Sequence, residues 1–373
     1  MINYKLSFIE SPSEIEINLN SSKSESNRLL IIKSLSDNKI ELENLSHAND
    51  TVLLKNLIRS NSQNIWDAED AGTTMRFLTS FLAITKQGVL LTGTERMKKR
   101  PIKILVYALN KIGAEISYNE KDGYPPIKIN RKISQIKESI SIRGDISSQY
   151  ISSLLMIAPV LPNGLKIDIM PPFYSKPYVM MTLNLMKKFG IKYDLSEDSI
   201  SINNQEYKSG SYKVESDWSA ASYWYSFISI NKKLKEIKLK GLREHSFQGD
   251  QVIEKIMTLF NVETLYDKDG IILRKKDFDC DYLELDFKDC PDLAQTVLVV
   301  AAFHKVKLKL YGVESLKIKE TDRLLAMKIE LNKIGVNFFD DNGIWTLERR
   351  NKPFPNKVSI DTYEDHRMAM AFA

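Results

Sequence analysis

Residues 331–347, LNKIGVNFFDDNGIWTL, carry the pattern that decides the fold. The pattern is the end of an amphipathic helix, a small turn residue and a strand hairpin with a polar tip. The other three copies are LNKIGAEISYNEKDGYPPIKI at residues 109–129, LMKKFGIKYDLSEDSISI at 185–202 and IMTLFNVETLYDKDGIIL at 256–273. The turn residues are Gly113, Gly190, Asn261 and Gly335, and successive turns lie 77, 71 and 74 residues apart. Gly or Asn directly after a helix is expected to adopt a left-handed backbone conformation.

A near-constant interval indicates a repeated supersecondary unit. Each interval also contains a second predicted helix, so the unit is expected to be mixed α/β with hairpins. The stretch His47–Trp66 is interpreted as a shortened earlier copy. The alternative is chance recurrence of a common helix–hairpin arrangement, which is the weaker reading for four copies at even spacing.

Six apolar segments of another kind lie between these copies. Each begins with small polar residues, often beside Arg or Lys, and continues as a helix that is predicted to be buried. They are SSKSESNRLLII (21–32), AGTTMRFLTSFLA (71–83), GDISSQYISSLLMIA (144–158), SDWSAASYWYSFISI (216–230), KDCPDLAQTVLVVAAF (288–303) and YEDHRMAMAFA (363–373). Helix N-termini bind anions, although Ser and Thr there also act as ordinary N-caps. Six such starts predict a shared cleft for anionic ligands.

The composition is that of a globular protein of 373 residues, a length that suits two domains of ~150 residues each. The net charge is only +5 and the Lys residues are scattered, which argues against nucleic-acid binding. The longest apolar runs, Ser152–Leu161 and Val297–Phe303, are far shorter than the ~20 residues that span a bilayer, so no membrane association is expected. The two cysteines show no zinc or redox spacing, so free thiols in the cytoplasm are expected. The four histidines are far apart in the sequence, so no metal site is expected.

Seven short segments, in order along the chain, resemble those of the EPSP synthase (3-phosphoshikimate 1-carboxyvinyltransferase) family. They are SSKSESNR (21–28), DAGTTMR (70–76), LTGTERMKKRPI (91–102), GDISSQY (144–150), YSKPY (174–178), IKETDR (318–323) and YEDHRMAM (363–370). One GTxMR or SSQ segment alone is a weak signal. Seven segments in the family's order, covering nearly the whole chain, are highly specific.

This resemblance implies an α/β fold of two similar domains, each built from three βαβαββ units, with a cleft between them. It implies that the chain crosses between the domains near Asn20 and near Asp217. The expected domains are therefore residues 1–20 together with 218–373, and the inserted residues 21–217. Because the chain stops at Ala373, just after the last segment begins a helix, the sixth unit is expected to be incomplete.

The activity implied by the resemblance is transfer of the enolpyruvyl group of phosphoenolpyruvate to the 5-hydroxyl of shikimate 3-phosphate, with release of phosphate. The resemblance implies no metal and no organic cofactor, and it implies these two small molecules as the partners of a monomer. It also implies that the herbicide glyphosate binds at the phosphoenolpyruvate site.

The resemblance assigns roles to individual residues. Shikimate 3-phosphate is expected at Lys23, Ser24, Arg28, Ser147, Ser148, Gln149, Ser175, Tyr178, Asp292, Ser315 and Lys319. Phosphoenolpyruvate is expected at Lys23, Asp70, Gly72, Arg96, Gln149, Arg323 and Arg367. Asp292 is expected to face the attacking hydroxyl, Glu320 to act as the acid/base group and Lys23 to lie between the substrates. Planar Arg donors suit both ligands because they pair bidentately with carboxylate or phosphate.

Local conformation and departures from the family pattern add further expectations. A helix at residues 319–323 would place Lys319 and Arg323 on one face, with Glu320 beside them. Asp70 and Ser315 stand where the family often has Asn, so ligand affinity is expected to differ.

Two rival readings remain open. The UDP-N-acetylglucosamine enolpyruvyl transferases share this fold and chemistry, but their catalytic Cys loop has no counterpart here, since Cys280 and Cys290 both lie in the last third of the chain. A non-catalytic binding protein is the other rival. The presence of both acid/base candidates, Asp292 and Glu320, argues against it.

Overall fold

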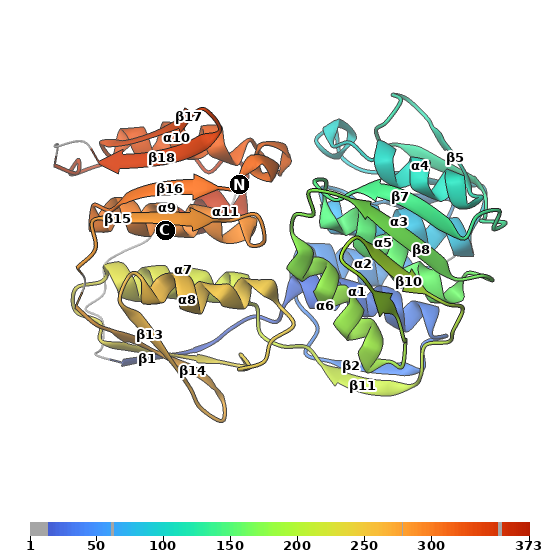
Figure 1. The fold of residues 1–373 in the computed structure, drawn as a ribbon, viewed down its shortest axis with the longest axis horizontal. Helices are drawn as coiled ribbons and strands as arrows, with labels where there is room; N and C mark the ends of the chain where they lie inside the picture. Colours follow the sequence, from blue (N-terminus) through green and yellow to red (C-terminus); the bar gives the residue numbers. More distant parts are fainter. Residues whose placement is uncertain (1–13, 61–62, 278, 350–352) are drawn as a thin grey trace.

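Four sheets with one common strand order make up most of the fold (Figure 1). The computed structural model describes residues 14–60, 63–277, 279–349 and 353–373. The strands are β1 (Glu14–Asn18), β2 (Ile40–Glu43), β3 (Ile65–Asp67), β4 (Val89–Thr92), β5 (Glu115–Tyr118), β6 (Ile127–Arg131), β7 (Ser139–Arg143), β8 (Leu165–Met170), β9 (Asp194–Leu195), β10 (Ser199–Ile202), β11 (Gly210–Lys213), β12 (Glu236–Lys240), β13 (Val262–Tyr266), β14 (Gly270–Lys275), β15 (Tyr282–Asp286), β16 (Lys307–Tyr311), β17 (Val336–Asp341) and β18 (Ile344–Arg349).

Each four-stranded sheet consists of two parallel strands followed by an antiparallel hairpin. The strand orders are β3–β4–β6–β5, β7–β8–β10–β9, β1–β12–β14–β13 and β15–β16–β18–β17. A fifth sheet contains the parallel pair β2 and β11. The common order confirms the repeated mixed α/β unit that the sequence predicts.

The helices supply the second layer. They are α1 (Lys23–Leu35), α2 (Asn49–Ser60), α3 (Gly72–Thr85), α4 (Lys103–Ile112), α5 (Ser148–Ile157), α6 (Lys176–Lys188), α7 (Trp218–Ile230), α8 (Ile253–Thr258), α9 (Ala294–His304), α10 (Arg323–Lys333) and α11 (His366–Phe372), with shorter 3₁₀ helices η1 (Met97–Lys99), η2 (Ala158–Val160), η3 (Gly249–Val252), η4 (Pro291–Leu293) and η5 (Glu314–Ile318). The six predicted apolar helices form two groups of three, and the helices pack on one another within each group. One group is α1, α3 and α5, and the other is α7, α9 and α11. Residues 294–302 of α9 are all buried, because this helix lies inside the molecule, whereas α7 and α11 each expose an apolar residue, Phe227 and Met370.

The turns before the four hairpins have the predicted left-handed backbone. The φ angles are +122° at Gly113, +86° at Gly190, +55° at Asn261 and +79° at Gly335. At Gly113 a Cβ atom would also lie 2.0 Å from the carbonyl oxygen of Ser134, so this position excludes any side chain.

The predicted earlier copy at His47–Trp66 is only partly correct. It contains helix α2, but β3 pairs in parallel with β4 and does not form a hairpin of its own. Residues 61 and 62, between the helix and the strand, lie outside the described part of the chain. Strand β3 therefore belongs to the sheet β3–β4–β6–β5 and not to a hairpin of the predicted copy.

Two buried hydrophobic clusters form the cores of the two lobes seen in Figure 1. One cluster extends from Leu29 to Val214, and the other from Trp218 to Ala371. Strand β1 belongs with the second cluster, because it pairs in parallel with β12. The two chain segments that connect the lobes run side by side. Asp217 donates its backbone N–H to the carbonyl of Asn20 at 2.9 Å.

A buried pair of carboxylates lies at this crossing. Glu25 and Glu215 are 0% and 1% exposed. Glu215 accepts hydrogen bonds from the Trp218 ring at 2.9 Å and from the Ser246 hydroxyl at 2.6 Å. Glu25 has weaker donors, the Tyr212 hydroxyl at 3.4 Å and the backbone N–H of Glu215 at 3.2 Å. Burial, with the charge of Glu215 adding to it, raises the pKa of Glu25 to about 7.

This raised pKa predicts a pH-dependent stability. Between about pH 4.5 and pH 7 the folded protein keeps a proton on Glu25 that the unfolded chain has released, so stability falls as pH rises through this window. Glu25→Gln is expected to flatten the dependence and to raise the free energy of unfolding at pH 8 by about 2 kcal/mol. Urea denaturation at pH 5 and pH 8 measures it, with the exposed Glu41→Gln as the matched control. An unchanged pH dependence in Glu25→Gln would contradict the assignment.

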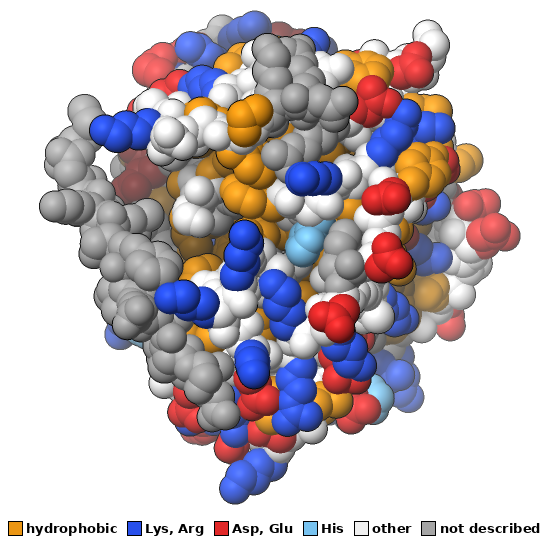
Figure 2. Space-filling model, turned by 90° about the vertical axis from the view of Figure 1, so that its left-hand side faces the viewer, with side chains coloured by type: hydrophobic (Ala, Val, Ile, Leu, Met, Phe, Trp, Pro, Cys, Tyr) orange, Lys and Arg blue, Asp and Glu red, His pale blue; other side chains and the backbone are white. Residues whose placement is uncertain are grey.

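One face of the C-terminal lobe carries both charged and hydrophobic side chains. Figure 2 shows basic and acidic side chains together on this face, with hydrophobic side chains gathered near its centre. Of the described helices, none combines the length and the apolar character that crossing a membrane requires.

Candidate active site

A pocket between the two lobes is lined by the starts of the apolar helices. Of the seventeen residues expected from the sequence, fifteen line it. They are Lys23, Ser24, Arg28, Gly72, Ser147, Ser148, Gln149, Ser175, Tyr178, Asp292, Ser315, Lys319, Glu320, Arg323 and Arg367. Helices α1, α3, α5 and α11 contribute from their first turns. The predicted gathering of helix N-termini around a shared cleft is therefore present for four of the six apolar helices, whereas the first turn of α7 does not line the pocket and α9 is represented only by Asp292 of the preceding η4.

Local capping explains why these helices begin at the pocket. Ser22 and Ser147 cap α1 and α5 with their side chains, as the sequence suggests. Ala71, at the start of α3, carries no side-chain oxygen and makes no such hydrogen bond. The first N–H groups of α3 are therefore available to an anionic ligand in the pocket.

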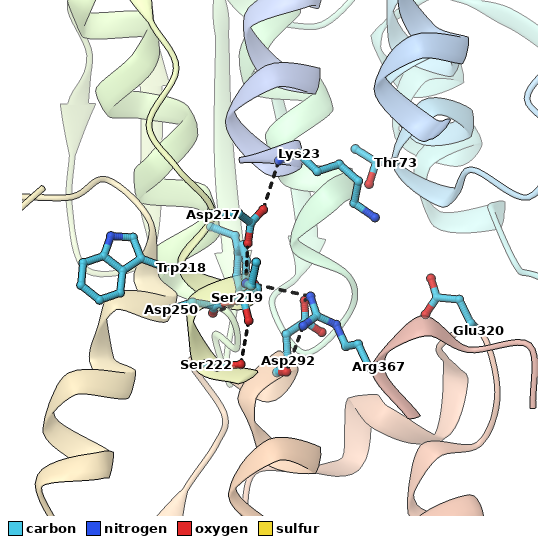
Figure 3. A network of polar contacts seen from close by, with 12 residues as sticks. Lys23, Thr73, Asp217, Trp218, Ser219, Ser222, Asp250, Asp292, Glu320 and Arg367 are labelled. Atoms are coloured by element: carbon cyan, nitrogen blue, oxygen red, sulfur yellow. Dashed lines mark hydrogen bonds and ion pairs between the residues drawn. The ribbon is translucent and has the colours of Figure 1, made fainter. Parts of the chain in front are cut away.

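Arg323 organises the acidic side of the pocket. Its side chain is buried and donates to three carboxylates: Nε to Asp365 at 2.8 Å, Nη2 to Glu320 at 2.8 Å and Nη1 to Asp292 at 3.2 Å. Arg367 donates to Asp292 from Nη2 at 2.8 Å, as Figure 3 shows. Two arginines and three carboxylates thus form one network, in which the arginines and Asp365 are buried and Asp292 and Glu320 are half-buried.

The network keeps both catalytic candidates ionised. Burial alone would raise the pKa of Asp292, but the charge of Arg367 and those of further cations outweigh it and hold this pKa well below its usual range. Burial likewise opposes ionisation of Glu320, yet Arg323 and Arg100 lower its pKa to about 2. Two negative groups can lie in one pocket because the surrounding cations compensate them.

The helix expected at residues 319–323 is not formed. Lys319 follows η5 with an extended backbone (ψ −152°), and α10 begins only at Arg323. The side chain of Asp322 caps α10 by accepting from the N–H of Leu325, which fixes the start of the helix at that point. The condition under which Lys319 and Arg323 would share a helix face is therefore not met. Glu320 meets Arg323 across the turn that precedes the helix.

The other side of the pocket is basic and rich in hydroxyl groups. Arg28 is 3% exposed, and its guanidinium is held by Thr182 at 2.7 Å and by the carbonyl of Ser24 at 2.9 Å. Burial lowers its pKa to about 10, so it remains cationic near neutral pH. Lys23 forms an ion pair with Asp50 at 3.3 Å. These contacts fix the cations before any ligand binds.

Asp70 and Arg96 do not line the pocket. The carboxylate of Asp70 accepts from the hydroxyl of Thr94 in a short contact. Arg96 donates from Nη2 to the carbonyl oxygen of Glu320 at 2.6 Å, which links the two lobes. In this conformation Arg96 therefore supports the backbone that carries Glu320.

Arg100 takes a place in the pocket that the sequence assignment overlooked. Its Nη1 lies 3.6 Å from Oε1 of Glu320, and a Cβ atom on Gly72 would lie only 2.7 Å from the same nitrogen. The missing side chain of Gly72 thus makes room for a guanidinium. Arg100 lies in the same segment as Arg96, four residues later, so the available signal was a second Arg in one motif.

His366 and Asp365, which are not among the site residues expected from the sequence, also contribute to the site. The ring of His366 lines the pocket, and burial, with the charge of Arg367 beside it, lowers its pKa to about 4. Asp365 caps α11 by accepting from the backbone N–H of Arg367 at 2.8 Å. It also forms the buried ion pair with Arg323, a contact that its position in the sequence does not reveal.

The fold and the pocket define an enzyme that binds anionic substrates between two lobes of repeated α/β units. Residues 54–373 match the family described as EPSP synthase (3-phosphoshikimate 1-carboxyvinyltransferase). A 3-phosphoshikimate 1-carboxyvinyltransferase of Bacteroides fragilis strain YCH46 is 45% identical over 98% of this chain and 89% of its own length. One of Buchnera aphidicola subsp. Baizongia pistaciae is 36% identical over 96% and 88%.

A solved structure of EPSP synthase from Acinetobacter baumannii has the same fold. It superposes with a TM-score of 0.75 at 18% identity, covering 96% of this chain and 88% of that one. From the family match and these relatives, the chain belongs to the EPSP synthase family. Its enzymatic activity is the transfer of the enolpyruvyl group from phosphoenolpyruvate to shikimate 3-phosphate.

Proposed function

We propose that the pocket between the lobes binds both substrates and that Asp292 and Glu320 carry out the proton transfers. The observation that carries this proposal is the placement of two ionised carboxylates on one buried arginine, Arg323, at the pocket wall. Asp292 accepts the proton of the attacking 5-hydroxyl. Glu320 delivers a proton to the methylene carbon of phosphoenolpyruvate and removes one from the new methyl group when phosphate leaves.

The hydroxyl-rich side of the pocket is assigned to shikimate 3-phosphate. Ser147 and Ser148 lie at the start of α5, where serine hydroxyls and N–H groups can share the phosphate. Arg28 adds a fixed cation there, and Gln149 is oriented by a hydrogen bond to Thr73 at 3.1 Å. Ser24, Ser175, Tyr178, Ser315 and Lys319 complete this set.

The arginine-rich side is assigned to phosphoenolpyruvate. Arg323 and Arg367 suit its carboxylate, and Lys23 lies beside Gly72 in the same pocket. Arg100 is added here as a cation for the phosphate. A bound anion competes with Glu320 for Arg323 and Arg100, so substrate binding raises the pKa of Glu320 from its resting value and prepares it to carry a proton.

The test of this assignment is phosphate release. The protein is expected to release phosphate from phosphoenolpyruvate only when shikimate 3-phosphate is present. Equal release with UDP-N-acetylglucosamine would overturn the substrate assignment. Calorimetric titration with shikimate 3-phosphate separates binding from chemistry, because a protein that binds without releasing phosphate would support the non-catalytic alternative.

The domain boundaries and the working environment complete the proposal. Residues 14–20 with 218–373 are assigned to one domain and residues 21–217 to the other, and residues 1–13 of the expected first segment lie outside the described part of the chain. The two hydrophobic clusters and the paired crossing support this division. The enzyme is proposed to work as a monomer in the cytoplasm, in the pathway that leads to chorismate and aromatic amino acids.

Gly72 provides a prediction about inhibition by glyphosate. A methyl group at this position would meet the guanidinium of Arg100 at 2.7–3.0 Å, so Arg100 must shift into the pocket or away from it. Gly72→Ala is expected to weaken glyphosate binding by about 10-fold or more, roughly the value of one charge-assisted contact. Phosphoenolpyruvate, the shorter molecule, should lose less.

Inhibition constants for glyphosate, measured beside the KM for phosphoenolpyruvate, decide this point. Gly210→Ala serves as the matched control, because its added Cβ would make only an ordinary contact, 3.6 Å from the ring of Phe189. Equal loss of glyphosate and of phosphoenolpyruvate in Gly72→Ala would show that the methyl group acts by displacing Arg100, which is assigned to the phosphate of phosphoenolpyruvate, and not through the extra length of glyphosate.

A further inference from the structure

Asp250 lies buried directly behind the substrate pocket, in the 3₁₀ helix η3. Its side chain is 3% exposed and is not among the residues that line the pocket. The hydroxyl of Tyr178, which does line the pocket, donates to Oδ1 of Asp250 at 2.7 Å. The hydroxyl of Ser219 donates to Oδ2 in a short contact. Both oxygens of this carboxylate therefore hold a hydroxyl group in place.

These two hydroxyl groups belong to different lobes. Tyr178 lies on α6 and packs against the core of the central lobe, whereas Ser219 lies on α7 of the C-terminal lobe. Helix η3 packs on α6 as well as on α7 and α8. The approach to α6 is close, because a Cβ atom on Gly249 would lie 2.3 Å from Cβ of Pro177. Asp250 thus forms part of the contact between the lobes.

The chain of contacts continues to the phosphoenolpyruvate side. Ser219 accepts from Nη2 of Arg367 at 3.5 Å, and the same nitrogen donates to Asp292 at 2.8 Å (Figure 3). A series of hydrogen bonds therefore runs from Tyr178 through Asp250 and Ser219 to Arg367. It connects the two proposed substrate sites behind the pocket wall.

The geometry points to Asp250 as a positioning residue that holds Tyr178 and, through Ser219, Arg367 in their substrate-binding orientations when the two lobes are together. This inference rests on the proposed function, which assigns Tyr178 to shikimate 3-phosphate and Arg367 to phosphoenolpyruvate. Asp250 itself touches neither substrate. Its effect is to fix the direction of two groups that do.

The pKa values of Asp250 and Tyr178 agree with a role for Asp250 in positioning the Tyr178 hydroxyl. Burial, with the charge of Asp292 adding to it, raises the pKa of Asp250 to about 6. Burial, with the charge of Asp250 adding to it, raises the pKa of Tyr178 far above its usual value, so its hydroxyl keeps its proton and donates. Because hydroxyl groups hold this buried carboxylate, the loss of either one leaves a polar group under-bonded.

The test compares Asp250→Ala, Tyr178→Phe and the double variant. Each single change is expected to raise the KM for shikimate 3-phosphate and its calorimetric Kd by about 10-fold, with a smaller rise in the KM for phosphoenolpyruvate. The double variant should be no worse than about the stronger single variant, because both changes break the same contact. Asp250→Asn, which keeps an acceptor for Tyr178, should recover most of the affinity.

Gln251→Ala is the matched structural control. Gln251 follows Asp250 in η3 and supports the local chain by donating to the carbonyl of Glu244 at 2.6 Å and to the hydroxyl of Tyr266 at 2.9 Å. Its loss should leave both KM values unchanged. If Asp250→Ala matches this control in its kinetics, or if the effects of Asp250→Ala and Tyr178→Phe simply add, the positioning role is wrong.

Gly249→Ala provides a second route if Asp250→Ala does not fold. The added methyl group keeps Asp250 but forces η3 away from Pro177, so the KM for shikimate 3-phosphate should again rise. Wild-type KM values in Gly249→Ala would count against the inference. Failure of the wild-type protein to bind shikimate 3-phosphate would overturn the proposed function, whereas wild-type binding with unaffected variants would overturn only this inference.

Discussion

Asp292→Asn is expected to lower turnover by about 10³-fold, the typical loss when a positioned general base is removed. The amide keeps the shape of the side chain but cannot accept the proton of the substrate hydroxyl. Arg323 retains Asp365 and Glu320 as partners, whereas Arg367 loses the carboxylate that it contacts at 2.8 Å. A fall in kcat with a smaller change in the KM values, from steady-state phosphate release, would support the role.

Asp365→Asn is the control that distinguishes the loss of the proposed base, Asp292, from the loss of an ion pair with Arg323. Asp365 also bonds Arg323, at 2.8 Å, but it does not line the pocket. Its replacement should therefore disturb the arginine network and the stability of α11 without removing a group that meets the substrate. If both variants lost turnover to the same extent, the effect of Asp292 would belong to the network and not to proton transfer.

Glu320→Gln is expected to reduce turnover by about 10²-fold or more while both substrates still bind. The amide oxygen can still accept from Arg323, so the pocket should keep its shape. What is lost is the group that carries a proton to and from carbon. Kd values from calorimetry, measured alongside single-turnover rates, test this combination. Turnover near that of the wild type would remove Glu320 from the mechanism.

Glu364→Gln is the matched control for this substitution. Glu364 is an exposed acid whose carboxylate lies 3.7 Å from Arg96. An exposed ion pair of this kind contributes little, so its loss should leave turnover within about 2-fold of the wild type. A large effect would indicate that the contacts of Arg96 across the lobes, and not Glu320 itself, limit catalysis.

The repeat could be predicted from the sequence because it rests on local chemistry, whereas the candidate site residues were expected from the resemblance of short segments to a known family. A Gly or Asn at the end of a helix, as at Gly113 or Asn261, adopts a positive φ at little steric cost, so the residue type itself indicates the turn. Apolar helices with small polar starts had to be buried with their N-termini directed at something polar. The short segments around Lys23, Ser147 and Arg323 then indicated the ligands.

What only the tertiary structure decided are the contacts between residues far apart in the chain. The pairing of Arg323 with Asp365, the place of Arg100 against Gly72 and the link from Tyr178 to Asp250 each join residues at least 28 positions apart. The absence of a helix at residues 319–323 has a local cause, because the side chain of Asp322 accepts from the N–H of Leu325 and so begins α10 at Arg323.

The physical reason for this division is the range of the forces. Turn conformation, capping and apolar periodicity depend on neighbouring residues, so the sequence by itself determined the repeated unit and the helix starts of this protein. The pKa values of Asp292 and Glu320 depend on charges that folding brings together in a buried pocket. Only the packed structure therefore decided which carboxylates are ionised and which guanidinium groups face them.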